Sequence, residues 1–185
     1  TQKEVGLSWS NTELTYNGDA QKPMATATGI VSGDEIAVTV SGEQTNVGTG
    51  YTATATELTG GKAGNYKLPE QATTTFSITN ATMTGITATA YNAPYDGEAH
   101  GITLSGVPEG STVTFGTTEG TYDLSTAPTY TDVAASCTVY YKVSKTNYND
   151  FTGSSTVTIT QAENSFTTQP SIEGWTYGAE ANAPA

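Results

Sequence analysis

The chain offers few residues whose types could support catalysis. His100 is the single histidine and Cys137 the single cysteine. A catalytic triad or a zinc site would need this histidine, or a set of thiolates and carboxylates around it. We interpret His100 as a hydrogen-bonding residue beside a turn, because the matching position earlier in the chain holds Gln21, which cannot titrate. Cys137 lies on the inward side of a predicted strand, where a thiol is usually inert.

Paired carboxylates would indicate glycoside hydrolysis, in which two acids face each other across the scissile bond. Asp96 and Asp132 lie at predicted turns, but the matching earlier positions hold the amides Asn17 and Asn46. An amide cannot act as a general acid or base, whereas Asp and Asn both form Asx turns. We therefore expect no enzyme activity, no catalytic residue, no metal ligand set and no cofactor.

Two stabilising devices stay open at this point. The acidity of the chain would suit calcium at the junctions between repeats, although no closely spaced Asp-x-Asp set is present. A Lys–Asn isopeptide crosslink would need a buried lysine, and Lys3 with Asn80 is the one pairing of terminal strands that the sequence suggests.

Aromatic residues give the candidate binding positions. Trp9 and Trp175 could stack on a sugar, but we interpret them as covers over the ends of thin cores. Tyr140 and Lys142 alternate with inward residues of the Cys137 strand and therefore face outward. An exposed tyrosine beside a lysine is our candidate surface contact, for a host protein or glycan ligand of unknown identity; the alternative is an ordinary cross-strand pair.

An internal repeat must position all of these residues. The pattern of residues 14–21 (LTYNGDAQ) returns at 93–100 (APYDGEAH) and, in part, at 175–182 (WTYGAEAN). The pair at 65–66 (NY) and the stretch at 76–79 (FSIT) likewise return as 147–148 (NY) and 157–160 (VTIT). A period of about 80 residues is too long for a solenoid and suits self-contained domains. We predict domains at 1–80 and 81–162, and the truncated start of a third at 163–185.

Alternation of apolar and polar residues predicts an all-β fold of antiparallel strands. Asn17-Gly18 and Asp96-Gly97 predict type I′ hairpin turns. The register places Cys137 where the first repeat has Tyr51. The expected inward residues of the first repeat are Ile36, Val38, Tyr51, Phe76 and Ile78, and those of the second are Val113, Phe115, Val139, Tyr141, Val157 and Ile159.

The charge balance excludes two classes of partner. Eighteen acidic residues face six lysines, and the formal net charge is −12. Nucleic acids need a basic footprint, and anionic membrane surfaces repel such a chain. No apolar run is long enough to span a membrane. We expect a monomer, or weak association through residues 163–185.

The repeated Tyr-Asx-Gly, the Asn-Tyr pair and the terminal Ile-Thr-x-Ala, in the same order twice, resemble the MBG/YDG group of bacterial surface Ig-like repeats. The resemblance implies Ig-like β-sandwich units in an extracellular, cell-surface or secreted bacterial protein, and it supplies no catalytic residues. The expected function is a structural and adhesive stalk or spacer. The alternative is an accessory, carbohydrate-binding module of a secreted glycan-active enzyme.

Overall fold

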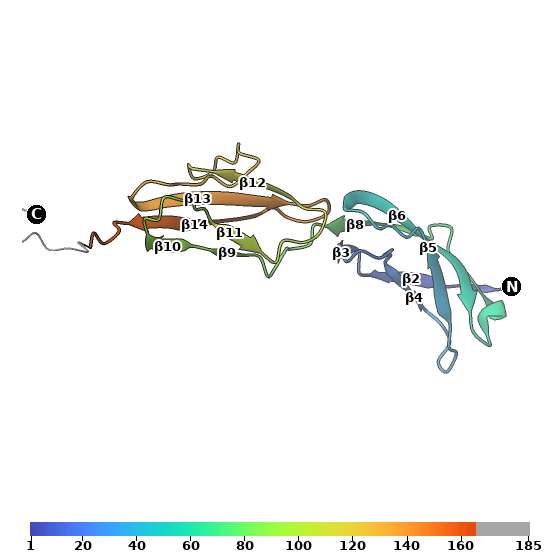
Figure 1. Cartoon of the computed structure of the whole chain (residues 1–185). Coiled ribbons are helices and arrows are strands. Elements are labelled where there is room, and N and C mark those ends of the chain that lie inside the picture. The colour runs from blue at the N-terminus through green and yellow to red at the C-terminus, as the bar shows by residue number, and fades with distance from the viewer. Residues whose placement is uncertain (166–185) are drawn as a thin grey trace, which may run out of the picture.

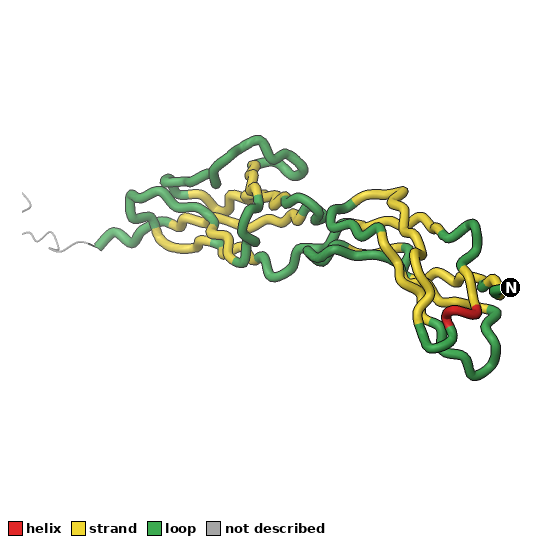
Figure 2. Tube along the Cα trace, turned by 90° about the vertical axis from the view of Figure 1, so that its right-hand side faces the viewer, coloured by secondary structure: helices red, strands yellow, loops and turns green. Residues whose placement is uncertain are grey.

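The fold is all-β, as predicted. The computed structural model describes residues 1–165, and the one helix among them is a single 3-10 turn, Ala63–Asn65. We call residues 1–80 the first repeat and residues 81–162 the second. Their strands form separate sheets, which lie end to end in an elongated molecule (Figures 1 and 2). Residues 166–185, which make up most of the predicted third repeat, lie outside the described part.

The first repeat is built on one curled sheet in the order β2-β4-β5-β6-β8-β3, with a small β1-β7 pair beside it. Only two residues separate β2 from β3, yet these strands form the two opposite edges of the sheet, so the sheet must fold back on itself around a core. Asn11, with φ +56°, lies at this switch. The bounds are β1 Lys3–Glu4, β2 Gly6–Ser10, β3 Glu13–Thr15, β4 Met24–Thr28, β5 Ala37–Ser41, β6 Gly48–Thr59, β7 Tyr66–Lys67 and β8 Thr73–Thr79.

The second repeat uses the same connections with fewer strands. A four-stranded sheet in the order β10-β14-β13-β12 faces the two-stranded sheet β11-β9. As in the first repeat, two consecutive strands separate: β9 pairs with β11, and β10 pairs with β14. The bounds are β9 Thr87–Thr89, β10 Tyr91–Pro94, β11 Thr103–Ser105, β12 Thr112–Gly116, β13 Ala134–Ser144 and β14 Phe151–Thr160.

The prediction of antiparallel strands is right for the long strands and wrong for three pairs. The pairs β1–β7, β3–β8 and β10–β14 run parallel. In the pairs β3–β8 and β10–β14 the chain crosses from one edge to the other near the start of its repeat, so an early strand meets the last strand in the same direction. Periodicity along one strand cannot reveal this pairing.

The predicted equivalence of Tyr51 and Cys137 is confirmed by the register. Tyr51 pairs with Phe76, and Cys137 pairs with Val157, the residue that corresponds to Phe76. The register shifts just before both residues, at Gly48 in one repeat and at Ala134 in the other. Both repeats therefore carry a β-bulge at the same place, where their longest strand begins.

The inward assignments are also confirmed. In the first repeat Phe76 and Ile78 are buried, and Ile36, Val38 and Tyr51 are half-buried and packed on the core. The second set has the same distribution: Val139, Tyr141, Val157 and Ile159 are buried, while Val113 and Phe115 pack against them.

The predicted type I′ hairpins are wrong. A type I′ turn needs positive φ at both central residues. Gly18 and Gly97 have φ +91° and +86°, but Asn17 and Asp96 do not have positive φ. The strand after the turn pairs elsewhere, since β4 bonds to β2 and β5 rather than to β3. The Asx side chains instead cap the turn, as Asn17 Oδ1 accepts from Asp19 N and Asp96 Oδ1 from Glu98 N, both at 2.9 Å.

Candidate functional site

The predicted contact residues Tyr140 and Lys142 lie on the outer face of β13, opposite the buried Val139 and Tyr141. Both are half-buried. The residues paired with them across the sheet are small or hydroxylated: Gly116, Ser154, Thr114 and Thr152. This face therefore presents one phenol ring and one cation among short side chains that are mostly hydroxylated.

Two neighbours hold Lys142 in place. Its Nζ lies 3.6 Å from Asp150 Oδ2 and 5.8 Å from the centre of the Tyr122 ring. A cation over an aromatic face is attracted by the ring quadrupole. Asp150 and Tyr122 both lie outside the strands, so a ligand contact at Tyr140 and an ordinary cross-strand pair both stay predictions.

His100 forms a cluster of titratable groups with Asp96 and Tyr91. Its Nε2 lies 2.9 and 3.0 Å from the two Asp96 carboxylate oxygens, and its ring stacks on Tyr91 with centroids 3.9 Å apart. The hydrogen bond from His100, helped by the Glu98 amide, lowers the pKa of Asp96. Burial, and then the Asp96 charge, raise the pKa of Tyr91.

This cluster holds the turn that begins at Asp96. Among the residues that the structure describes, no hydroxyl or thiol hydrogen-bonds to His100. Its backbone pairs with Tyr130, just as Gln21 pairs with Gln44 in the first repeat. The interpretation of His100 as a hydrogen-bonding residue beside a turn is confirmed.

Cys137 lies as predicted, half-buried and packed on the core of the second repeat. Trp9 likewise packs on the core of the first repeat, which agrees with its interpretation as a cover. Trp175 lies outside the described residues, as do the other aromatic residues of the C-terminal segment.

The acidic residues are dispersed, and Asp34 has a structural role. It accepts a hydrogen bond of 2.7 Å from the Tyr66 hydroxyl, which in turn accepts one of 2.9 Å from Val31 N. The bond to Asp34 raises the pKa of Tyr66. Between residues 1 and 165, no three His, Cys, Asp or Glu side chains come close enough to hold a metal ion.

The isopeptide pairing suggested by the sequence is wrong. Lys3 lies in β1, at the N-terminal end of the first repeat, whereas Asn80 follows β8 at the opposite end (Figure 1). Both residues are exposed. The parallel pairing places β1 beside β7, so Lys3 and Asn80 cannot form a bond.

The most specific constellation is one that sequence reasoning did not predict: the junction between the repeats. Asn147, in the β13–β14 turn, reaches across to the first repeat. Its Oδ1 accepts a hydrogen bond of 3.1 Å from Val47 N, and its Nδ2 donates one of 2.9 Å to Asn46 Oδ1. A side-chain amide is the group that can accept from one neighbour and donate to the other.

The backbone around Asn147 is shaped for this contact. Asn147 has φ +68°, the left-handed region that asparagine tolerates better than other non-glycine residues. Tyr148 N donates to Lys145 O at 3.0 Å and closes the turn. The adjacent Ala81 pairs with the same turn, because Ala81 N donates to Asn147 O and Asn149 N to Ala81 O. The linker is thereby tied to the turn that reaches across.

An aromatic contact completes the junction. The rings of Tyr16 and Tyr148 meet edge to face, with centroids 5.5 Å apart. This is a favoured geometry for aromatic pairs. Lys145 Nζ lies 5.3 Å from the centre of the Tyr148 ring. The repeated Asn-Tyr pair was the sequence signal for this site, but it could not show that the second copy faces the preceding repeat.

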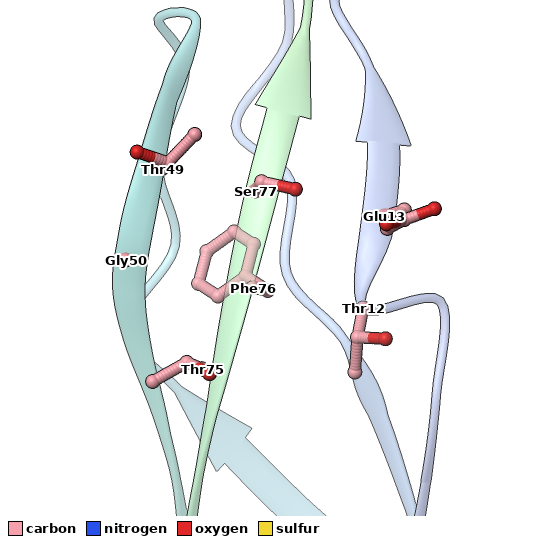
Figure 3. A pocket seen from close by; sticks show the side chains of 7 residues that line it. All are labelled: Thr12, Glu13, Thr49, Gly50, Thr75, Phe76 and Ser77. Atoms are coloured by element: carbon pink, nitrogen blue, oxygen red, sulfur yellow. The ribbon is translucent and has the colours of Figure 1, made fainter.

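One shallow hollow lies along β8, between β6 and β3 (Figure 3). Its volume is about 320 Å³. Glu13 is the only charged lining residue, so the hollow offers hydrogen bonds without an acid–base pair. The lining residues are Thr12, Glu13, Thr49, Gly50, Thr75, Phe76 and Ser77.

Comparison with known protein families gives a match, which lies within the first repeat. Residues 1–75 match the YDG domain family. The match confirms the resemblance drawn from the Tyr-Asx-Gly and Asn-Tyr motifs. No curated protein matches the chain. In residues 1–165, which the structure describes, no helix is long and apolar enough to cross a membrane.

Proposed function

We propose that this chain is a non-catalytic structural and adhesive spacer in a bacterial cell-surface or secreted protein. In this proposal residues 1–80 and 81–162 are two tandem Ig-like β-sandwich domains, and a third begins at residue 163. The chain then serves to hold a distal part of the protein away from the cell. The match to the YDG family over residues 1–75 supports a domain of this kind in the first repeat.

The observation that carries the proposal is the short, tied junction. β8 ends at Thr79, and Ala81 is already hydrogen-bonded to the Asn147 turn, so Asn80 alone separates the two repeats. Side-chain contacts from Asn147 and Tyr148 then reach the first repeat. A linker of this kind removes most of the hinge freedom expected between domains.

The dimensions suit a spacer. Strand β13 runs along the long axis of the molecule, whereas β6 curves away from it (Figure 1). At about 3.3 Å per residue, β13 spans roughly 36 Å, and the first repeat adds to this length because the two repeats lie end to end. The net charge of −12 would also oppose association between neighbouring stalks.

The distance between the repeats tests the proposal. Spin labels at the exposed positions Met24 and Leu124, in a Cys137→Ser background, should give a narrow distance distribution by pulsed electron spin resonance. Asn147→Gly combined with Tyr148→Ala should broaden it. The matched control is Asn65→Gly, which changes the equivalent asparagine of the first repeat away from the junction. A broad distribution in the otherwise unchanged chain would overturn the proposal.

The outer face of β13 favours a second candidate, an accessory carbohydrate-binding module. Tyr140 there pairs with Gly116 and Ser154, and Lys142 is fixed by Asp150 and Tyr122. A ring on a flat polar face suits stacking on a sugar. Binding on a glycan array that is lost in Tyr140→Ala and kept in Thr54→Ala, the equivalent position of the first repeat, would support this function.

A further inference from the structure

The distal end of the second repeat exposes the residues that the junction covers in the first repeat. Tyr95 corresponds to Tyr16, because Tyr95 N donates to Thr160 O as Tyr16 N donates to Thr79 O. Val133 corresponds to Val47 by the shared register of the strands that follow them. Tyr16 and Val47 are half-buried. Tyr95 and Val133 are 43% and 50% exposed and are among the few large apolar side chains so exposed.

The distal end of the second repeat also carries polar groups that correspond to those of the junction in the first repeat. Asp132 stands where Asn46 accepts the hydrogen bond from Asn147 Nδ2, and Val133 N stands where Val47 N donates to Asn147 Oδ1. Asp132 is exposed. A carboxylate accepts from an amide N–H at least as well as the Asn46 carbonyl does. The end therefore keeps one donor, one acceptor and one aromatic ring in the same relation.

We propose that the surface formed by Tyr95, Asp132 and Val133 is a docking face for the Asn-Tyr turn of a following repeat of this type. The incoming asparagine accepts from Val133 N and donates to Asp132, and the tyrosine places its ring edge against Tyr95. The occupant is argued from the junction already described, in which the second repeat covers the equivalent face of the first. This inference rests on the proposed tandem-repeat function.

The direct test adds a following repeat to the chain, so that the proposed docking face can be covered. In a lengthened chain, residues 81–161 occur twice in succession, so that Gln161 is followed by a second Ala81 and the chain then continues to residue 185. Val133→Cys is placed in the first of the two copies, with Cys137→Ser throughout, and its rate of maleimide labelling is measured. We expect labelling at least about tenfold slower than in the original chain, because the thiol reacts only when the junction opens.

Matched variants isolate the docking turn. Asn147→Gly with Tyr148→Ala in the added copy alone should restore fast labelling of Val133→Cys. Val31→Cys, 54% exposed and away from both junctions, should react fast in every chain, which shows that slow labelling of Val133→Cys is specific to its position. Equal rates for Val133→Cys in the original and lengthened chains would overturn the inference.

Other occupants give distinct outcomes, and each would overturn it. Slow labelling of Val133→Cys in the original chain, independent of concentration and relieved by deleting residues 166–185, would assign the face to the C-terminal segment. Slowing that increases with protein concentration would assign it to a second copy of the chain.

The first junction separates this inference from the proposed function. In the original chain Val47→Cys should label slowly, and Asn147→Gly with Tyr148→Ala should accelerate it. If Val47→Cys does not respond, the tied junction itself fails. If it responds while Val133→Cys remains fast in the lengthened chain, only the docking face fails.

Discussion

The two repeats share a topology but place their large side chains at different positions. In the first repeat Tyr51 covers Gly48, and a Cβ at Gly48 would lie 2.3 Å from the tyrosine oxygen. The second repeat has Cys137 and Ala134 at these positions. A large ring over a glycine is thus replaced by a small side chain beside an alanine.

The opposite exchange occurs further along the same strands. In the second repeat Tyr141 pairs with Gly153, where a Cβ would lie 2.4 Å from the tyrosine oxygen. The first repeat has Ala55 in this place, hydrogen-bonded through its backbone to Ala72. Each repeat therefore has one Tyr–Gly pair, which lies near the start of β6 in the first repeat and further along the strand, between β13 and β14, in the second. The backbone pairings are kept, while the volume of each core is redistributed.

Removing the ring should break the second core. Tyr141→Ala deletes a buried aromatic side chain and should lower the free energy of unfolding of the second repeat by about 3–5 kcal/mol. Native-state hydrogen exchange of the Val139 amide measures this loss. The equivalent Ala53 amide reports on the first repeat, which should change far less. Equal losses at both amides would mean that the repeats unfold as one unit.

Adding a side chain at Gly153 should destabilise the second repeat less than removing the Tyr141 ring does. Gly153→Ala places a Cβ against the Tyr141 ring and should destabilise the second repeat by about 1–3 kcal/mol. In the Tyr141→Ala background the same change should be nearly neutral, so a double-mutant cycle isolates the pair. Ala72→Gly in the first repeat is the matched control and should show no coupling to Ala55.

Much of this comparison could be predicted from sequence, because it depends on local pattern. Alternation gave the inward residues and the equivalence of Tyr51 with Cys137, and the Asx side chains cap their turns. The Tyr–Gly exchange could not be found, since the pairing of Tyr141 with Gly153 joins different strands. The same limit applied to the parallel edges, to Lys3 with Asn80 and to the Asn147 junction, each of which depends on long-range contacts.

The junction should be sensitive to a single side chain. Asn147→Gly keeps the left-handed backbone and removes the two hydrogen bonds to the first repeat, at a cost of about 1 kcal/mol. Asn147→Ala should cost about 1–2 kcal/mol more, because alanine is strained at φ +68°. Denaturant titration followed by far-ultraviolet circular dichroism measures both. A larger loss in the glycine variant would show that backbone strain plays no part.

Low pH should destabilise the Asp96 turn of the second repeat and leave the matching Asn17 turn of the first repeat unaffected. His100 lowers the pKa of Asp96, so this carboxylate stabilises the fold above its unfolded pKa and loses that effect as the pH falls through the lower, folded value. The second repeat should therefore lose this contribution to its stability as the pH falls below about 4, the usual Asp pKa.

Asp96→Asn should weaken this acid response while keeping the Asx turn, as Asn17 does in the first repeat. The Val139 amide again reports on the second repeat. The first repeat has its own acid-sensitive contact, because the hydrogen bond from Lys22 lowers the pKa of Glu43. That response should be the same in the Asp96→Asn chain. An unchanged Val139 response would place the acid sensitivity elsewhere.

Cys137 provides the smallest expected effect. Its half-buried position on the core should make its labelling by DTNB slow in the native chain and fast after unfolding. Cys137→Ser should leave the repeat folded. Rapid labelling of the native chain would show that the second core is open where Tyr51 closes the first.

The parallel pairing of the early strand with the last strand has a mechanical consequence. A tension applied along the molecule pulls β3 and β8 in opposite directions along their common axis, and it does the same to β10 and β14. The hydrogen bonds between parallel strands are evenly spaced and slanted to that axis. They are therefore loaded together in shear rather than opened one after another, so each repeat resists extension where its early strand pairs with its last strand.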